Sequence, residues 1–155
     1  STWDRDQIDE GIRILERTLR RQRPGPYQIQ AAIAACHAEA RVAGDTDWPQ
    51  IALLYRQLAH LSPGPVVELN RAVAVAMADG PAAGLSIVDE IAGTGLLDEY
   101  YPLPATRADL LRRLGRNDEA ATAYRQAIAL APADPQRRFM ERRLAEVTSG
   151  VSDAC

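Results

Sequence analysis

Apolar residues along the chain recur at intervals of three and four, the spacing of amphipathic helices rather than strands. The pattern is clearest over residues 107–132, which it predicts to be two helices folded back on each other. Gly115 stands at the expected turn, and a proline follows the second helix. Small residues allow close helix approach, and one aromatic residue fills the space between the helices. The small, small, aromatic, small and proline positions are Ala108, Ala120, Tyr124, Ala127 and Pro132.

The same periodicity predicts helices on the N-terminal side of this pair and one helix after it. No stretch alternates with period two, so no sheet is expected. Residues 96–103 are the least regular, with one short turn expected at 98–100 before two prolines. Asp47 and Asn117 are expected to cap the helices that follow them. The expected helices cover residues 4–21, 27–42, 48–61, 65–78, 81–92, 107–114, 117–130 and 134–148.

One face of each expected helix is assigned to the interior. The helix over residues 65–78 is apolar on more than one side, which predicts a central position. The inward residues of the first, second and third helices are Ile8, Ile12, Leu15, Leu19, Ile29, Ile33, Cys36, Ala40, Ile51, Leu54, Leu58 and Leu61. Those of the later helices are Val66, Leu69, Val73, Ala76, Leu85, Val88, Ile91, Met140, Leu144 and Val147.

Internal similarity indicates a helical repeat. The twelve-residue separation of Ala108 and Ala120 recurs between Ala72 and Gly84, and the shift from 72 to 108 is close to the period of about 34 residues of tetratricopeptide repeats. The segment over residues 107–132 resembles that repeat, and two more degenerate copies precede it. The predicted fold is all-α: antiparallel helical hairpins stacked as a short tetratricopeptide-like solenoid, with an orthogonal bundle as the alternative.

Four parts are predicted along the chain. Residues 1–23 form an N-terminal packing helix, residues 26–132 three hairpins, residues 133–148 a capping helix, and residues 149–155 a flexible tail. A solenoid buries its core between neighbouring repeats, so a last helix with one polar, arginine-rich face is expected to close it.

Composition narrows the function classes. Apolar residues are 46% and charged residues 25%, as in an ordinary globular protein, and the net charge of -3 disfavours nucleic-acid binding by the whole domain. All 18 basic residues are arginine, so ion pairs will use a planar group with several donors. Two cysteines give neither a disulfide framework nor metal spacing, which favours a reducing cytoplasm. No apolar run is long enough to cross a bilayer.

Candidate catalytic chemistry is confined to His37 and Glu39. Residues two apart on a helix point about 200° apart and cannot share one ion or substrate. His37 is therefore expected to be a partly buried packing or hydrogen-bonding residue, and His60 has no obvious partner. No catalytic residue, metal site or cofactor is predicted.

Candidate partner-binding residues lie on two helices. Arg107, Asp109 and Arg112 belong to a dense charged flank, which either pairs with itself at i+3 and i+4 spacing or grips an acidic peptide through guanidinium groups. Asn70 and Arg71 precede the small residue of the middle repeat. Peptide-binding tetratricopeptide repeats place an asparagine at this position, where its amide can both donate to and accept from an extended backbone.

A second resemblance rests on five motifs: Trp3-Asp4-Arg5 with Ile8 and Gly11, Gly25-Pro26-Tyr27-Gln28-Ile29-Gln30-Ala31-Ala32-Ile33, Asp45-Thr46-Asp47-Trp48, Leu69-Asn70-Arg71-Ala72-Val73-Ala74-Val75 and Arg107-Ala108-Asp109-Leu110-Leu111-Arg112-Arg113-Leu114-Gly115-Arg116. With these motifs, the chain from Trp3 to about Val147 is similar to the C-terminal extension of a group of bacterial extracytoplasmic-function (ECF) sigma factors. That extension carries tetratricopeptide-like helices after the promoter-reading domains.

This resemblance implies a non-catalytic regulatory domain of a transcription initiation factor, with the promoter-binding and polymerase-binding helices lying before Ser1. The implied partners are the sigma core domains, RNA polymerase or a signalling protein, and no direct contact with nucleic acid or membrane is expected. The implied contact surface consists of Asn70, Arg71, Arg107, Asp109 and Arg112. The alternatives are a free-standing scaffold that binds peptides and an all-helical enzyme.

Overall fold

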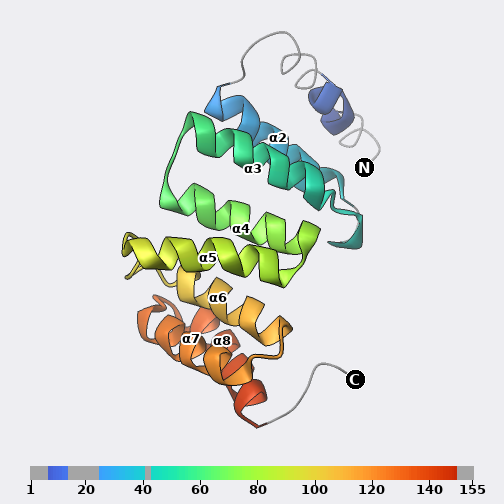
Figure 1. Ribbon diagram of the computed structural model, residues 1–155. Coiled ribbons are helices and arrows are strands. Elements are labelled where there is room, and N and C mark those ends of the chain that lie inside the picture. The colour runs from blue at the N-terminus through green and yellow to red at the C-terminus, as the bar shows by residue number, and fades with distance from the viewer. Residues whose placement is uncertain (1–6, 14–24, 41–42, 150–155) are drawn as a thin grey trace. The chain divides into compact units, whose positions relative to one another are not determined.

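The computed structural model describes residues 7–13, 25–40 and 43–149 (Figure 1). These residues form helices joined by short turns, and none of them is in a strand. Residues 7–13 are helical, and a short 3-10 helix, η1, covers Ala43–Asp45. The longer helices are α2 (Pro26–Glu39), α3 (Trp48–Leu61), α4 (Pro65–Asp79), α5 (Pro81–Thr94), α6 (Pro102–Arg113), α7 (Asn117–Leu130) and α8 (Asp134–Thr148).

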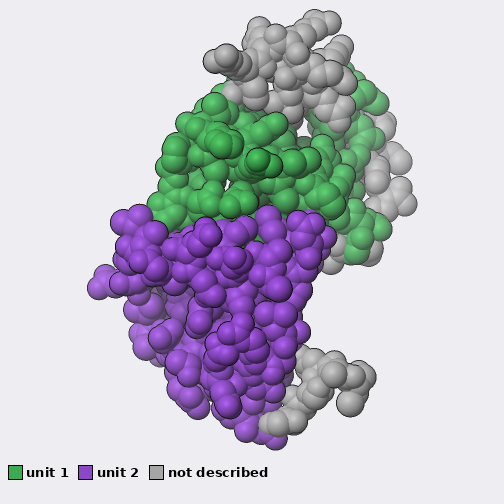
Figure 2. Space-filling model, in the orientation of Figure 1, with its two compact units in different colours: residues 1–74 green, residues 75–155 purple. Residues whose placement is uncertain are grey.

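The chain divides into two compact units, residues 1–74 and residues 75–155 (Figure 2). The boundary falls within α4. In the first unit, α2 and α3 pack against each other as a hairpin. In the second, α6 packs between α5 and α7, and α7 also contacts α8. The fold is the predicted all-α one, built of helical hairpins between neighbours in the sequence, and α8 occupies the predicted capping position.

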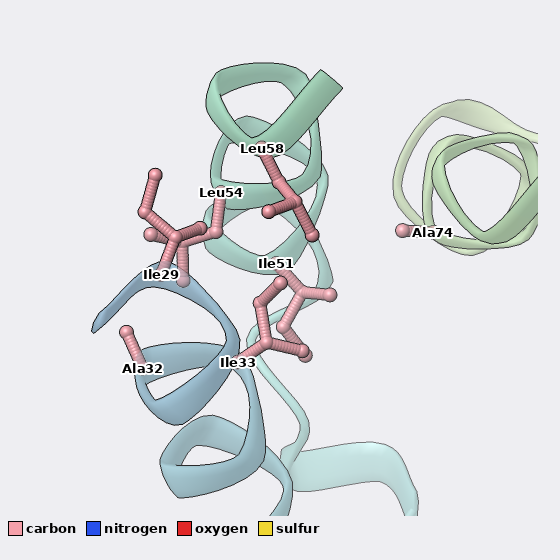
Figure 3. Packing of buried hydrophobic residues seen from close by; sticks show 7 residues of the cluster. All are labelled: Ile29, Ala32, Ile33, Ile51, Leu54, Leu58 and Ala74. Atoms are coloured by element: carbon pink, nitrogen blue, oxygen red, sulfur yellow. The ribbon is translucent and has the colours of Figure 1, made fainter. Parts of the chain in front are cut away.

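The core of the first unit lies between α2 and α3 (Figure 3). Ile29 and Ile51 are fully buried, and Ile33, Leu54 and Leu58 are nearly so, which confirms the predicted stripes of both helices. Partly buried side chains surround the cluster, among them Cys36, Trp48 and Tyr55. At the end of α3 the prediction is wrong, because Leu61 is 47% exposed.

Close approach of α6 and α7 organises the second unit. Ala108, Ala120 and Ala127 are completely buried, and Tyr124 is 2% exposed. Side chains of one carbon at the contact allow two helix axes to come near each other, since interaxial distance follows side-chain size. The predicted alternation of small residues and one aromatic is confirmed.

The predicted turn at Gly115, the end of α7 before Pro132 and the cap at Asp47 are all found in the structure. Gly115 adopts φ +76°, a left-handed conformation that is unstrained only in glycine. Ala131, the residue before Pro132, is extended, so α7 ends at Leu130. The Asp47 carboxylate accepts a hydrogen bond of 3.2 Å from the backbone N–H of Gln50, which confirms the predicted cap of α3.

Helix starts in the second unit depart from the prediction. The helix expected from residue 107 begins at Pro102, because prolines in the first turn replace N–H groups that have no partner there. Asn117 is the first residue of α7 and not its cap, which is Arg116 with no side-chain hydrogen bond.

Two predicted inward residues of α4 are exposed. Val66 is 39% and Val73 37% exposed, whereas Leu69, Ala72 and Ala74 are buried. The buried face of α4 therefore includes Ala72 and Ala74 in place of the predicted Val66 and Val73. Beyond residues 7–13, the first predicted helix over residues 4–21 lies outside the described residues, as does the predicted tail after Ser149.

We expect Gly115→Ala and Gly93→Ala to have opposite effects on stability. A Cβ atom meets nothing within 4 Å at either position, but Gly115 has φ +76° and Gly93 lies within α5. Gly115→Ala should therefore destabilise the protein by about 1 kcal/mol through backbone strain. Gly93→Ala should stabilise it by up to about 1 kcal/mol. Urea unfolding followed by circular dichroism measures both, and equal effects would contradict the assigned turn.

We expect Ile51→Ala to destabilise the first unit by about 2–5 kcal/mol, because the side chain is fully buried in the core and leaves a cavity. Leu53→Ala, on the same helix but 61% exposed, should change stability by about 0.5 kcal/mol or less. Amide hydrogen exchange of α2 and α3 measures the stability of the first unit in both variants. Unchanged protection of these amides in Ile51→Ala would contradict the core assignment.

Candidate functional site

The predicted partner-binding residues belong to two helices and two compact units. Asn70 and Arg71 lie on α4 in the first unit, and Arg107, Asp109 and Arg112 lie on α6 in the second. Each group is described by itself.

On α4, Asn70 is exposed and Arg71 is partly buried. Arg71 holds the carboxylate of Glu68 with two nitrogens, Nε at 3.3 Å and Nη2 at 3.1 Å. This fork spans one helical turn and orients the guanidinium along α4. Asn70 is left as the exposed polar side chain beside it.

On α6, Arg107 forms an ion pair with a different helix. Its Nε donates to the Asp89 carboxylate on α5 at 2.9 Å, and its side chain is 29% exposed. The contact ties the exposed edges of α5 and α6 together. It uses one of the five N–H donors of the guanidinium, and the two Nη groups take no part in it.

Asp109 and Arg112 form the most buried polar contact described on α6. Asp109 accepts from Arg112 Nη2 at 2.8 Å and from Arg113 Nε at 3.0 Å, and the Arg112 side chain is 14% exposed. Burial alone would lower the pKa of Arg112, but hydrogen bonds with Asp109 and Tyr124 outweigh it and raise the pKa above its usual range. Arg112 therefore stays charged; its contact with Asp109 lies within α6, and its contact with Tyr124 joins α6 to α7.

Ion pairing at i+3 and i+4 is confirmed for this flank. Beyond the Asp109 pairs, Arg116 holds Glu119 with Nε at 2.9 Å and Nη2 at 2.6 Å. The hydrogen bond from Arg116 lowers the pKa of Glu119, and the charge of Arg107 lowers it further. The hydrogen bond with Glu119 raises the pKa of Arg116, and the charge of Asp89 adds to that rise. Asp89, Arg107, Arg116 and Glu119 thus form one group of coupled charges, the α5–α7 charge cluster.

No pattern in the sequence predicts that Asp89 belongs to this cluster. It lies 18 residues from Arg107, so no helical spacing connects them. A second missed contact joins Arg113 Nη1 to the sulfur of Met77 at 3.4 Å. Both pairs depend on how neighbouring helices are aligned, and a sequence pattern within one helix carries no signal for that alignment.

His37 is exposed, not partly buried as expected. Its ring packs edge-on against Trp48, with 5.4 Å between ring centroids and 74° between ring planes. Within the described residues, no group of three His, Cys, Asp or Glu side chains is placed to hold a metal ion. The contact gives His37 a position at the junction of α2 and α3.

Comparison with known proteins finds an uncharacterized relative in Rhizobium meliloti (strain 1021). The two chains are 45% identical over 142 residues, a match that covers 92% of this chain and 33% of the relative. The chain therefore spans about a third of the length of the curated relative it matches. No family model matches the chain, and no solved structure does. In the described ranges, every helix is too short or too polar to span a bilayer.

We expect the stability of the second unit to fall at high pH partly through Tyr124. Burial raises the pKa of its phenol, and the hydrogen bond from Arg112 offsets part of that rise. The folded pKa lies above the unfolded value of about 10, so this contribution is intact below pH 10 and lost as pH rises through the folded pKa. Urea unfolding at about pH 8 and about pH 11 measures the loss.

Tyr124→Phe should lose less stability than the wild type between these two pH values. Tyr100→Phe removes a phenol that is 38% exposed and serves as the matched control in the same unit. Its loss should equal that of the wild type. Equal losses in all three proteins would show that the Tyr124 phenol titrates normally.

Proposed function

We propose that this chain is a non-catalytic, protein-binding regulatory segment of a bacterial sigma factor of the ECF group. The sequence resemblance supports this assignment, and the all-α helical-repeat fold is the architecture that the resemblance implies. The Rhizobium relative extends well beyond the matched region, which leaves room in that protein for further domains. The proposed setting is the bacterial cytoplasm, with the sigma core domains, RNA polymerase or a signalling protein as partner.

The α5–α7 charge cluster is the observation that carries the proposal. Asp89 holds Arg107 through Nε alone, so the planar guanidinium is oriented before a partner arrives. An oriented guanidinium loses little side-chain entropy on binding a carboxylate, and two terminal nitrogens match two carboxylate oxygens. An acidic side chain of the partner would add to Arg107 on the side away from Asp89.

Asn70 supports the second candidate function, a free-standing scaffold for peptides. It is exposed on α4 one turn from Val66 and one turn from Val73, which are exposed as well. An amide between two apolar side chains can hydrogen-bond an extended backbone while its neighbours contact apolar side chains of the peptide.

Run-off transcription with reconstituted polymerase tests the sigma-factor proposal. The full-length factor that contains this chain is compared with a version ending before residue 1. Removal should raise or lower transcription about tenfold while the sigma core stays folded, equivalent to about 1.4 kcal/mol. Unchanged transcription would overturn the regulatory role and favour the scaffold.

Substitutions in the full-length factor test the surface itself. Arg107→Glu should change transcription in the same direction as the truncation, because it reverses the charge offered to the partner. Asp89→Asn keeps Arg107 but weakens the ion pair that orients it, and should change transcription in the same direction by a smaller amount. Arg125→Glu, at an exposed arginine of α7 outside the cluster, is the matched control and should leave transcription close to wild type. Equal effects of Arg107→Glu and Arg125→Glu would contradict the assigned surface.

A further inference from the structure

Helix α8 has an exposed face opposite its buried one. Met140 and Val147 are buried against the rest of the second unit. At about 100° per residue, Arg138 and Arg142 lie on the far side of the helix from them, with Phe139 at the margin of that side. Arg138, Phe139 and Arg142 are all exposed.

Phe139 is the only phenylalanine of the chain and is 49% exposed. Two guanidinium carbons lie over its ring, that of Arg143 at 5.4 Å and that of Arg142 at 6.0 Å from the centroid. These contacts are within the range of cation–π attraction. They hold both arginines beside the ring, so the apolar ring and the positive charge are presented together.

The arginines of α8 differ in what they already bind. Arg143 pairs with Glu146 at 3.0 Å, and Arg137 donates to the Ala131 carbonyl at 3.2 Å at the end of α7. Arg138 and Arg142 form no ion pair with any residue that the structure describes. Glu141 borders the face, and Glu146 is neutralised by Arg143, so the face has a net positive charge.

We infer that this face of α8, made of Arg138, Phe139 and Arg142, binds an acidic protein segment that carries an apolar side chain. Two arginines one turn apart match two carboxylates at the same spacing, and the Phe139 ring receives the apolar side chain. A nucleic acid would bring a continuous row of phosphates past Glu141, whereas a short peptide can place its carboxylates on the two arginines alone, so the face favours a peptide over a nucleic acid. The inference is independent of the α5–α7 charge cluster and of the sigma-factor proposal.

Fluorescence anisotropy with the whole chain tests this inference. The probe is a labelled synthetic peptide of about twenty residues with glutamates and leucines at i, i+4 spacing. A second peptide of the same length has glutamine in place of every glutamate. The acidic peptide should bind at least about tenfold more tightly than the neutral one, and the difference should shrink as salt rises from about 0.05 to 0.3 M.

Variants assign the binding to α8. Arg138→Glu with Arg142→Glu should weaken binding of the acidic peptide at least about tenfold, and Phe139→Ala should weaken binding of both peptides. The control, Arg56→Glu with Arg125→Glu, changes net charge equally at exposed arginines of α3 and α7 and should change affinity less than about twofold. All of these side chains are exposed, and circular dichroism checks that each variant is folded.

Four results would overturn the inference. These are equal affinity for the two peptides, equal loss in the α8 and control variants, and tighter binding of a random DNA duplex than of the acidic peptide. The fourth is concentration-dependent dimerisation that Arg138→Glu with Arg142→Glu abolishes, which would make a second copy of this chain the occupant.

Discussion

The second unit depends on the close approach of α6 and α7. Alanines at the contact remove the side-chain volume that would keep the two helices apart, and Tyr124 fills the remaining space. This arrangement buries the Tyr124 phenol and most of the Arg112 guanidinium, which costs free energy of hydration. Hydrogen bonds from Arg112 to Asp109 and to Tyr124 compensate for that cost. Packing and polar contacts therefore support the same helix pair.

Four of the described arginines fall into two pairs that differ in what holds the guanidinium group. Arg112 and Arg137 contribute to the fold, one through Asp109 and the other through the carbonyl at the end of α7. Arg107 and Arg142 are exposed or half-exposed and are oriented by a single neighbour, Asp89 or Phe139. A guanidinium suits both roles because it has several donors and remains charged when partly buried.

Sequence reasoning predicted the features that one helix or one turn determines. The buried alanines, the Gly115 turn and the end of α7 before Pro132 depend on local backbone preferences, and the Asp109 pairs depend on helical spacing. The contact between Arg107 and Asp89 could not be predicted, because it depends on the alignment of α5 with α6. The start of α6 was predicted too late because residues 96–103 show no regular apolar spacing, although a first helical turn accepts Pro102 and Pro104.

The position of α8 has a consequence for assembly. Each helix of a repeat array offers an apolar face to the next, and an uncovered face would template the addition of another copy, as an open edge strand does in a sheet. Met140 and Val147 cover α7, while the far side of α8 is charged. The charged far side of α8 therefore offers no apolar face on which another copy of the repeat could stack.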